Sequence, residues 1–327
     1  IDLEKENITS RLDKDCDLMG DIELFCRINE KPIIAVTGSN GKSTVVSLLA
    51  HVGEQLGYTI TLAGNIGTPV LSQPLNQSDF VILELSSFQL ETVSHLEALA
   101  ATVLNVSDDH LDRHQNIENY ATIKNRIFDG CQHLVVNRLE ATSSALIANS
   151  HITYGKDKAS AEQFGVSCID GKLALNKGDS TLIELSELPL AGSHNAENYT
   201  AVLALGTAAG WPLEKMVAQL ASFSGLAHRC ERVKSKTNKQ WINDSKATNV
   251  GAAIAAIDGL ADSLVDNASL ILIAGGDGKG ADFRPLAAKV HENVEHCIVF
   301  GKDAATLKSL IPQAVLVPDI ESAVAEA

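Results

Sequence analysis

The chain has 327 residues, of which 45% are hydrophobic and 20% charged, an ordinary globular composition with ample material for a core. Its length predicts two domains. The formal net charge of −15 argues against a nucleic-acid-binding protein, because such proteins usually present a basic face. It does not exclude an anionic small-molecule substrate, since a few lysines and arginines can form a local positive pocket.

The cysteines and the apolar runs indicate a cytoplasmic protein. Six cysteines are scattered along the chain without a CxxC pair, which favours reduced thiols over a disulfide framework or a zinc site. The longest apolar runs are too short to span a bilayer, and we expect neither a signal peptide nor a membrane partner. The chain begins at Ile1 rather than Met and ends at Ala327 within a helical-looking run, so we expect a fragment.

The first half of the chain alternates between short apolar runs and helical stretches. Residues 1 to 20 are polar and have no clear period. From residue 31 the runs PIIAVT, YTITLAG, DFVILEL, AATVLNV and HLVVN are separated by helical stretches. Such alternation predicts an α/β fold with a parallel sheet that is covered on both faces. A section rich in turn residues, roughly 150 to 190, predicts a small antiparallel excursion.

A second α/β unit is predicted after a short linker. The helical stretches NAENYTAVLALGTAAG and PLEKMVAQLASF precede the linker, which lies near residues 224–226. The alternation then restarts with WIND and continues through SLILIAGG, HCIVFG and AVLVP. We therefore expect a tail at 1–20, a central domain at 21–225 and a C-terminal domain at 226–327.

The turn TGSNGKST, which follows an apolar run and precedes a helical run at Lys42, has the GK[ST] core of a phosphate-binding loop. The strict pattern has a glycine where this chain has Val36, so a plain strand-to-helix turn is the alternative. In the phosphate-binding reading, backbone N–H groups and Lys42 hold phosphates, while Ser43 or Thr44 holds Mg²⁺. The candidate nucleotide-binding residues here are Gly38, Ser39, Asn40, Gly41, Lys42, Ser43 and Thr44.

Polar residues follow two further predicted strands. Glu84 ends the strand DFVILEL, and His110 lies in the stretch NVSDDHLDRH after the next strand. The carboxyl ends of parallel strands form the rim where ligands bind, so both residues are candidate metal ligands. The alternatives are a solvated or capping acid at Glu84, and a polar loop with aspartate caps around His110. Oxygen-rich neighbours disfavour zinc.

The later stretches each admit a binding role and a capping role. Asn195 and Asn198, three residues apart at the start of a helix, suit an adenine edge or a ribose. The alternative is that Ser193 or Asn195 caps the helix. The stretch GGDGKGADF, with Lys279 as its cation, is equally compatible with a plain βα turn. The residues of the second unit that could contact phosphates, ribose or a carboxylate are Arg229, Asp244, Lys246 and Thr248.

Taken in order, these motifs resemble the Mur ligases, the ATP-dependent amino-acid ligases of peptidoglycan synthesis. The motifs that carry the resemblance are TGSNGKST, AGNIG, LELSSFQLE, NVSDDHLDRH, YATIKNR, GSHNAEN, AHRCE, WINDSKATN and GGDGKGADF, and the resemblance covers residues 32 to about 301. WINDSKATN discriminates best, and it is similar to the members that join D-glutamate to UDP-N-acetylmuramoyl-L-alanine through an acyl phosphate. The resemblance implies a P-loop-type central domain, a Rossmann-like C-terminal domain that stops early, and an N-terminal UDP-binding domain that is mostly absent here.

The resemblance also implies a role for each site residue. Lys42 would bind the β- and γ-phosphates of ATP, Ser43 and Glu84 a first Mg²⁺, and His110 a second Mg²⁺ and the substrate. Lys124, which by itself reads as an ordinary surface lysine, matches the family lysine that carries an N-carbamate and ligates metal. The other roles implied are Asn65 for the UDP-muramoyl substrate, Asn195 and Asn198 for adenine, Arg229 for phosphates, Asp244 for ribose, and Lys246, Thr248 and Lys279 for D-glutamate.

Several alternatives remain at this point. Another Mur-type or folylpolyglutamate-type ligase would use the same loops. A P-loop ATPase or kinase would release or transfer phosphate without forming an amide, and it leaves WINDSKATN unexplained. A nucleotide-binding regulatory module is a class without catalysis. We expect a monomeric cytoplasmic ligase with two Mg²⁺ ions and no nucleic-acid partner.

Overall fold

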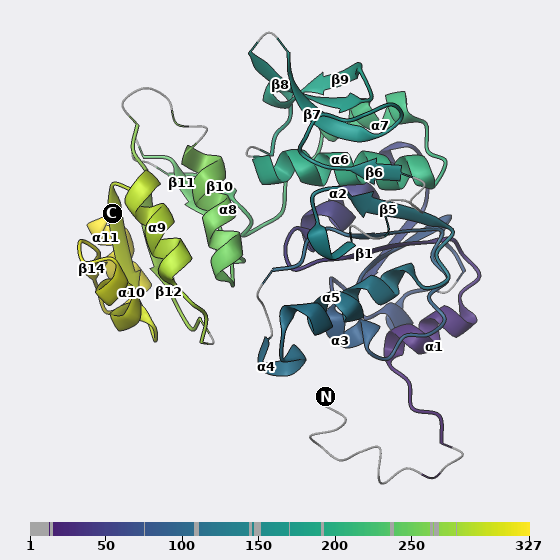
Figure 1. The fold of residues 1–327 in the computed structure, drawn as a ribbon, viewed down its shortest axis with the longest axis horizontal. Helices are drawn as coiled ribbons and strands as arrows, with labels where there is room; N and C mark the ends of the chain where they lie inside the picture. Colours follow the sequence, from purple (N-terminus) through teal and green to yellow (C-terminus); the bar gives the residue numbers. More distant parts are fainter. Residues whose placement is uncertain are drawn as a thin grey trace.

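The computed structural model describes residues 13, 16–74, 76–107, 111–143, 146, 152–169, 171–190, 193–235, 239–261, 264, 268–278 and 280–327. They form two α/β units, one up to the stretch 222–227 and one after it (Figure 1). The α/β fold class predicted from the alternating pattern is confirmed. Within the described ranges, no helix combines the length and apolarity needed to cross a membrane.

A six-stranded parallel sheet forms the centre of the first unit. Its order is β2-β3-β1-β4-β5-β6, and every neighbouring pair of strands is parallel. β1 is buried along its whole length, as its unbroken apolar run predicts. The carboxyl ends of β3, β1 and β4 therefore lie side by side. The strands are β1 (Ile33–Thr37), β2 (Ile60–Gly64), β3 (Phe80–Glu84), β4 (Ala100–Val103), β5 (His133–Asn137) and β6 (Ile152–Tyr154).

Helices cover both faces of this sheet (Figure 1). Ile34 and Val36 of β1 belong to one apolar cluster, whereas Ile33 and Ala35 belong to the other, because successive strand residues point to opposite faces. The first cluster includes helices α2 (Lys42–Gln55), α6 (Ser193–Ala208) and α7 (Leu213–Leu220). The second includes α1 (Asp21–Ile28), α3 (Ser87–Leu90), α5 (Ile117–Asn125) and the 3-10 turn Arg126–Phe128.

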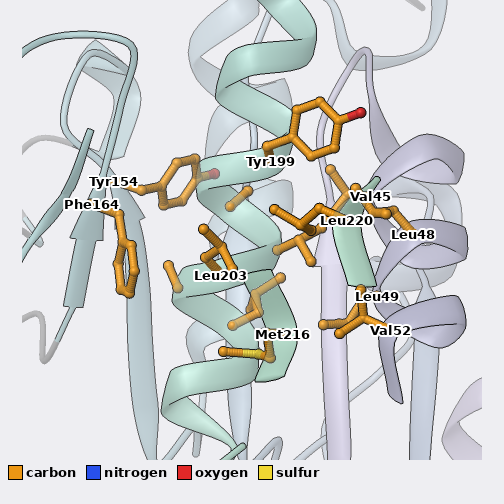
Figure 2. Packing of buried hydrophobic residues seen from close by; sticks show 14 of the residues in the cluster. Val45, Leu48, Leu49, Val52, Tyr154, Phe164, Tyr199, Leu203, Met216 and Leu220 are labelled. Atoms are coloured by element: carbon orange, nitrogen blue, oxygen red, sulfur yellow. The ribbon is translucent and has the colours of Figure 1, made fainter. Parts of the chain in front are cut away.

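Helix α6 lies at the centre of the first cluster (Figure 2). Its residues Tyr199 and Leu203 are fully buried, and side chains of α2 such as Val45 and Leu49 lie beside them. Burying one such leucine contributes roughly 1.5–3 kcal/mol. Packing of α2 against α6 therefore holds the start of α2 firmly in place relative to the sheet.

A small antiparallel sheet follows the parallel one, as the turn-rich section predicts. Its strands β7 (Phe164–Ile169), β8 (Lys172–Lys177) and β9 (Ser180–Glu184) pair in sequence order. Phe164 packs into the same cluster as α6, so this sheet extends the core of the first unit. The remaining short elements of the unit are α4 (Leu111–His114) and the 3-10 turns Val70–Ser72 and Leu185–Glu187.

The second unit has a three-stranded parallel sheet of order β12-β13-β14 with its own apolar cluster. The strand predicted at WIND does not join this sheet among the described residues. It is β11 (Trp241–Asn243) and pairs antiparallel with β10 (Glu231–Val233), because the two strands are separated by only a short connection. The other elements are α8 (Val250–Ala261), β12 (Ile271–Gly275), α9 (Arg284–Asn293), β13 (His296–Phe300), α10 (Ala304–Leu310), β14 (Val315–Leu316) and α11 (Ile320–Glu326).

A buried carboxylate attaches α1 to the rest of the first unit. Glu23 is 2% exposed and accepts hydrogen bonds from the backbone N–H groups of Ser94 at 2.7 Å and His95 at 3.2 Å. Its other oxygen accepts from Arg27 Nε at 2.8 Å and contacts His95 Nδ1 at 2.6 Å. Burial by itself raises the pKa of Glu23, but these four contacts outweigh burial and lower it to about 2.

We expect Glu23→Gln to lower the free energy of unfolding of the first unit by about 3 kcal/mol at neutral pH. The pKa of Glu23 is lowered in the folded state, so its contribution is complete well above the unfolded value of 4.5 and is lost as pH falls towards about 2. Chemical denaturation at about pH 7 and about pH 3 should therefore show a smaller difference between variant and wild type at the lower pH.

The matched control is Glu162→Gln, because Glu162 pairs with Lys177 at the exposed surface and should affect stability little. An effect of Glu23→Gln that stays constant between the two pH values would contradict this account of α1.

Candidate active site

The phosphate loop, residues 37–44, connects β1 to α2 with a backbone that requires glycine. Gly41 has φ +84°, in the left-handed region, and Gly38 has φ +153°. A Cβ at Gly41 would lie 2.8 Å from Asn198 Oδ1. In the part of the chain that the structure describes, no side chain caps the start of α2 at Gly41. The first N–H groups of α2 are therefore available to an anion, and the helix dipole favours negative charge there.

Two lysines converge on one carbonyl oxygen of this loop. Lys42 Nζ donates to Gly38 O at 2.7 Å and to Ser39 O at 3.0 Å. Lys124 Nζ, which comes from α5, donates to the same Gly38 O at 2.9 Å. Two ammonium groups within hydrogen-bonding distance of one oxygen repel each other. An anion bound beside them would relieve that repulsion.

Lys124 is 1% exposed, so its interpretation as a surface lysine is wrong. Lys124 is buried because α5, which is capped by Asn116, packs on the sheet face that carries Ile33 and Ala35. Tyr120 lies one turn earlier on the same helix face, and the Lys124 ammonium lies 4.5 Å from the centre of its ring. Burying an ammonium group is costly unless opposite charge or hydrogen bonds compensate it. Lys124 Nζ offsets part of that cost by donating to Gly38 O at 2.9 Å and to Thr37 Oγ1 at 3.4 Å.

Glu84 occupies the carboxyl end of β3, beside the loop. It is 2% exposed, which contradicts the alternative of a solvated acid. Its Oε1 accepts from Asn65 Nδ2 at 3.1 Å, whereas its Oε2 is buried without a hydrogen-bond partner among the described residues. An unsatisfied buried carboxylate oxygen is expensive, so this atom fits a site that a cation fills.

A cavity of about 280 Å³ opens at this rim of the sheet. Two lysines, an amide and two serine hydroxyls converge in it, and two aromatic rings complete its wall. This combination suits an anionic group that is attached to a larger, partly apolar molecule. The residues that line this central cavity are Lys42, Asn65, Ser86, Ser87, Phe88, Tyr120 and Lys124.

A buried histidine supports the cavity wall and was missed by sequence reasoning. His114 is 3% exposed and stacks on Phe88 and on Tyr120, with ring centroids 5.6 Å and 4.9 Å away. Its Nε2 lies 3.0 Å from Ser87 Oγ, and its Nδ1 lies 3.7 Å from Glu91 Oε1. The sequence offered one indirect signal for this contact. Tyr120 and Lys124 are four residues apart on one face of α5, which indicates that this face could point inward.

The two candidate adenine residues lie against the phosphate loop. Asn195 and Asn198 are 7% and 8% exposed, and Asn198 Nδ2 donates to Asn195 Oδ1 at 3.1 Å. The contact between Asn198 and Gly41 explains why α6 packs so close to the loop. Asn195 is the third residue of α6, so the alternative that it caps this helix is wrong. Asn198 therefore lies beside the phosphate loop, and its hydrogen bond to Asn195 links the two amides.

The second unit reaches the loop through Arg229. Its Nη2 donates to Ser43 Oγ at 3.0 Å. Asp244 lies nearby and accepts from the backbone N–H of Cys230 at 3.1 Å. Partial burial raises the pKa of Asp244, and the Cys230 hydrogen bond and the Arg229 charge offset this only in part. These contacts bring residues more than 180 positions apart to one site.

Several candidate residues are not brought into this arrangement. Lys246 and Thr248 lie with exposed side chains in the turn between β11 and α8. Thr44 lies in the first turn of α2 and is partly exposed. His110 and Lys279 lie outside the described residues, so their roles stay predictions. Among the residues that are described, no three His, Cys, Asp or Glu side chains cluster as a metal site.

Sequence families match both units. Residues 36–206 match the Mur ligase middle domain, and residues 228–327 match the glutamate ligase domain of Mur ligases. A UDP-N-acetylmuramoylalanine–D-glutamate ligase from Colwellia psychrerythraea is 50% identical over the whole chain, which spans 73% of that relative. An enzyme of the same name from Pseudomonas putida is 44% identical over 91% of the chain, which spans 66% of that relative.

Solved structures share the fold at low sequence identity. MurF from Acinetobacter baumannii has a TM-score of 0.73 at 17% identity, over 93% of this chain and 71% of that one. Escherichia coli FolC in complex with ADP has a TM-score of 0.68 at 18% identity, over 98% of this chain and 91% of that one. The resemblance seen in the sequence motifs is confirmed by the family matches: the chain belongs to the Mur ligase family.

Proposed function

We propose that this chain carries the ATP-binding and amino-acid-binding parts of a ligase that joins D-glutamate to UDP-N-acetylmuramoyl-L-alanine in peptidoglycan synthesis. The observation that carries the proposal is the convergence of Lys42, Lys124 and Glu84 at one rim of the sheet, in a chain 50% identical to a ligase of that name. ATP, when bound, supplies the phosphoryl group that activates a carboxylate for amide formation.

In this proposal the phosphate loop and the central cavity hold the reacting groups. The N–H groups at the start of α2 and the ammonium of Lys42 bind phosphate oxygens, and Lys42 must release Gly38 O to do so. Asn65 orients the muramoyl substrate at the cavity wall, where its amide already contacts Glu84. Fixed positive groups around the cavity favour the negative charge that develops during phosphoryl transfer.

The metal-binding residues that are described fit Mg²⁺, which takes hard oxygen ligands. Ser43 Oγ would hold a first ion together with Glu84 Oε2, which has no hydrogen-bond partner among the described residues. Ser43 must then release its hydrogen bond to Arg229. An N-carbamate on Lys124 would convert a buried cation into an anionic oxygen ligand for a second ion, together with His110. The carbamate would also end the repulsion between the two lysines on Gly38 O.

The second unit supplies the remaining roles in this proposal. Arg229 binds nucleotide phosphate, and Asp244 accepts from a ribose hydroxyl. Lys246, Thr248 and Lys279 receive D-glutamate, whose two carboxylates suit cationic and hydroxyl groups. We place the boundary between the units at residues 225 and 226, within the stretch that follows α7. The enzyme acts in the cytoplasm as a monomer.

The test is incorporation of radiolabelled D-glutamate into UDP-N-acetylmuramoyl-L-alanine by the full-length protein. We expect incorporation that requires ATP and Mg²⁺ and releases one ADP and one phosphate per amide formed. Phosphate release without incorporation would indicate an ATPase, and nucleotide binding without turnover would indicate a regulatory module. Either result from a correctly folded protein would overturn the proposed ligase.

A further inference from the structure

The side chain of Asn249 makes two hydrogen bonds in different directions. Its Oδ1 accepts from the backbone N–H of Ala252 at 2.8 Å and so caps α8. Its Nδ2 donates to Oδ1 of Asn40, in the phosphate loop of the other unit, at 3.0 Å. One amide therefore both begins the helix that follows the turn 244–249 and touches the loop. No role was predicted for Asn249 from the sequence.

The receiving residue, Asn40, is held in place from the opposite side. Its backbone N–H donates to Asn105 Oδ1 at 2.8 Å, and Asn105 Nδ2 donates to Asn40 O at 3.1 Å. Its own Nδ2 lies 3.5 Å from Ser107 Oγ. Because these bonds fix the backbone and the amide of Asn40, its Oδ1 faces Asn249 in a defined orientation. The start of α8 is thus hydrogen-bonded directly to the phosphate loop.

We infer that Asn249 is a positioning residue that couples nucleotide binding in the phosphate loop to the turn carrying Lys246 and Thr248. The inference rests on the proposed function, since it assumes a nucleotide in the loop and an amino acid at the turn. A nucleotide bound in the loop further restricts the backbone that carries Asn40, and the hydrogen bond from Asn249 transmits this restriction to α8. One hydrogen bond supports a coupling of about 3- to 10-fold in affinity.

The contact of Arg229 with the loop cannot transmit nucleotide binding in the same way, because the bound nucleotide and its metal would break that hydrogen bond. Arg229 donates to Ser43 Oγ, a group that the proposed function assigns to Mg²⁺. The bond between Asn40 and Asn249 uses side-chain atoms that no proposed ligand needs. It therefore persists when the nucleotide is bound, which is the condition for transmitting its presence.

The structure allows the two roles of Asn249 to be separated by substitution. Asn249→Ser keeps a hydroxyl oxygen that can cap α8 but is too short to reach Asn40. Asn249→Asp keeps the cap and the length of the side chain, yet it has no N–H donor and sets an anionic oxygen against Asn40 Oδ1. The control is Asp319→Ser, which changes another N-cap of the second unit, where Asp319 Oδ1 accepts from Ser322 N–H at 2.8 Å.

The experiment is hydrogen exchange of the full-length protein with and without Mg²⁺ and the non-hydrolysable analogue AMP-PNP. In the wild type and in Asp319→Ser we expect the analogue to protect residues 38–44 and also residues 248–253. In Asn249→Ser and Asn249→Asp we expect protection of residues 38–44 only. In steady-state assays the KM for D-glutamate should rise about 3- to 10-fold in both Asn249 variants, more than kcat falls.

Each outcome decides the inference. Protection of 248–253 in Asn249→Ser equal to that in the wild type would overturn it, as would a wild type in which only the loop is protected. Exchange at 38–44 that the analogue leaves unchanged in the wild type would contradict the proposed nucleotide site itself, and this inference with it. A double-mutant cycle with Asn40→Ala should be non-additive; additive effects would show that the two amides act separately.

Discussion

Replacing Lys124 with alanine should reduce amide formation by at least about 100-fold while the protein remains folded. The ammonium is buried at the wall of the central cavity and donates to the phosphate loop at Gly38 O. In the proposed function Lys124 also carries an N-carbamate that binds metal. Initial rates of D-glutamate incorporation, measured beside circular dichroism of the same samples, test this expectation.

Chemical rescue distinguishes the carbamate from a simple cationic role. Added short carboxylates should restore part of the activity of Lys124→Ala, because they supply the lost oxygen ligand, whereas added alkylamines should not. Nuclear magnetic resonance with ¹³C-labelled bicarbonate should show a carbamate in the wild type that is absent in the variant. Lys172→Ala, which removes an exposed lysine paired with Glu184, is the control and should be fully active. Full activity of Lys124→Ala would refute its role.

Replacing Glu84 with glutamine should lower kcat by about 100-fold and raise the Mg²⁺ concentration needed for half-maximal activity. Glutamine has nearly the same shape, and its carbonyl oxygen can still accept from Asn65 Nδ2. What it removes is the negative charge at Oε2, the oxygen without a partner among the described residues. A Mg²⁺ titration of ligase activity at saturating ATP measures the effect.

The same variant should leave the free energy of unfolding unchanged or increase it. A buried anionic oxygen that no hydrogen bond satisfies destabilises the fold, and a neutral amide relieves that cost. Glu23→Gln provides the converse control, because this buried carboxylate is hydrogen-bonded to Ser94 and His95 and does not line the central cavity. It should affect stability without changing the Mg²⁺ requirement. Wild-type Mg²⁺ dependence in Glu84→Gln would remove Glu84 from the metal site.

Much of the fold could be predicted because its evidence is local. The unbroken apolar runs at 33–36 and 80–83 became parallel strands of the buried sheet, and the helix after TGSNG begins at Lys42. The exception was β11, which pairs with β10 instead of joining the parallel sheet. Strand existence depends on a short stretch of residues, whereas the choice of partner depends on the path of the whole chain.

The candidate site was predictable in outline for a similar reason. Parallel strands end at one rim, so the loop after β1 and Glu84 after β3 had to be neighbours once β1 and β3 paired. The burial of Lys124 could not be predicted, because a single lysine in a nine-residue helix has no pattern that sets its environment. Its proposed role rests on the family motif alone, whereas its burial results from the packing of α5.

By itself the sequence determined the alternating α/β architecture, the glycine-bearing phosphate loop and membership of the Mur ligase family. Each of these follows from residues that are close in the chain or from motifs in a fixed order. Only the tertiary structure decided that two lysines donate to Gly38 O, that Asn198 packs against Gly41, and that Asn249 donates to Asn40. Those contacts join side chains across separate elements, and their distances depend on packing that no local pattern encodes.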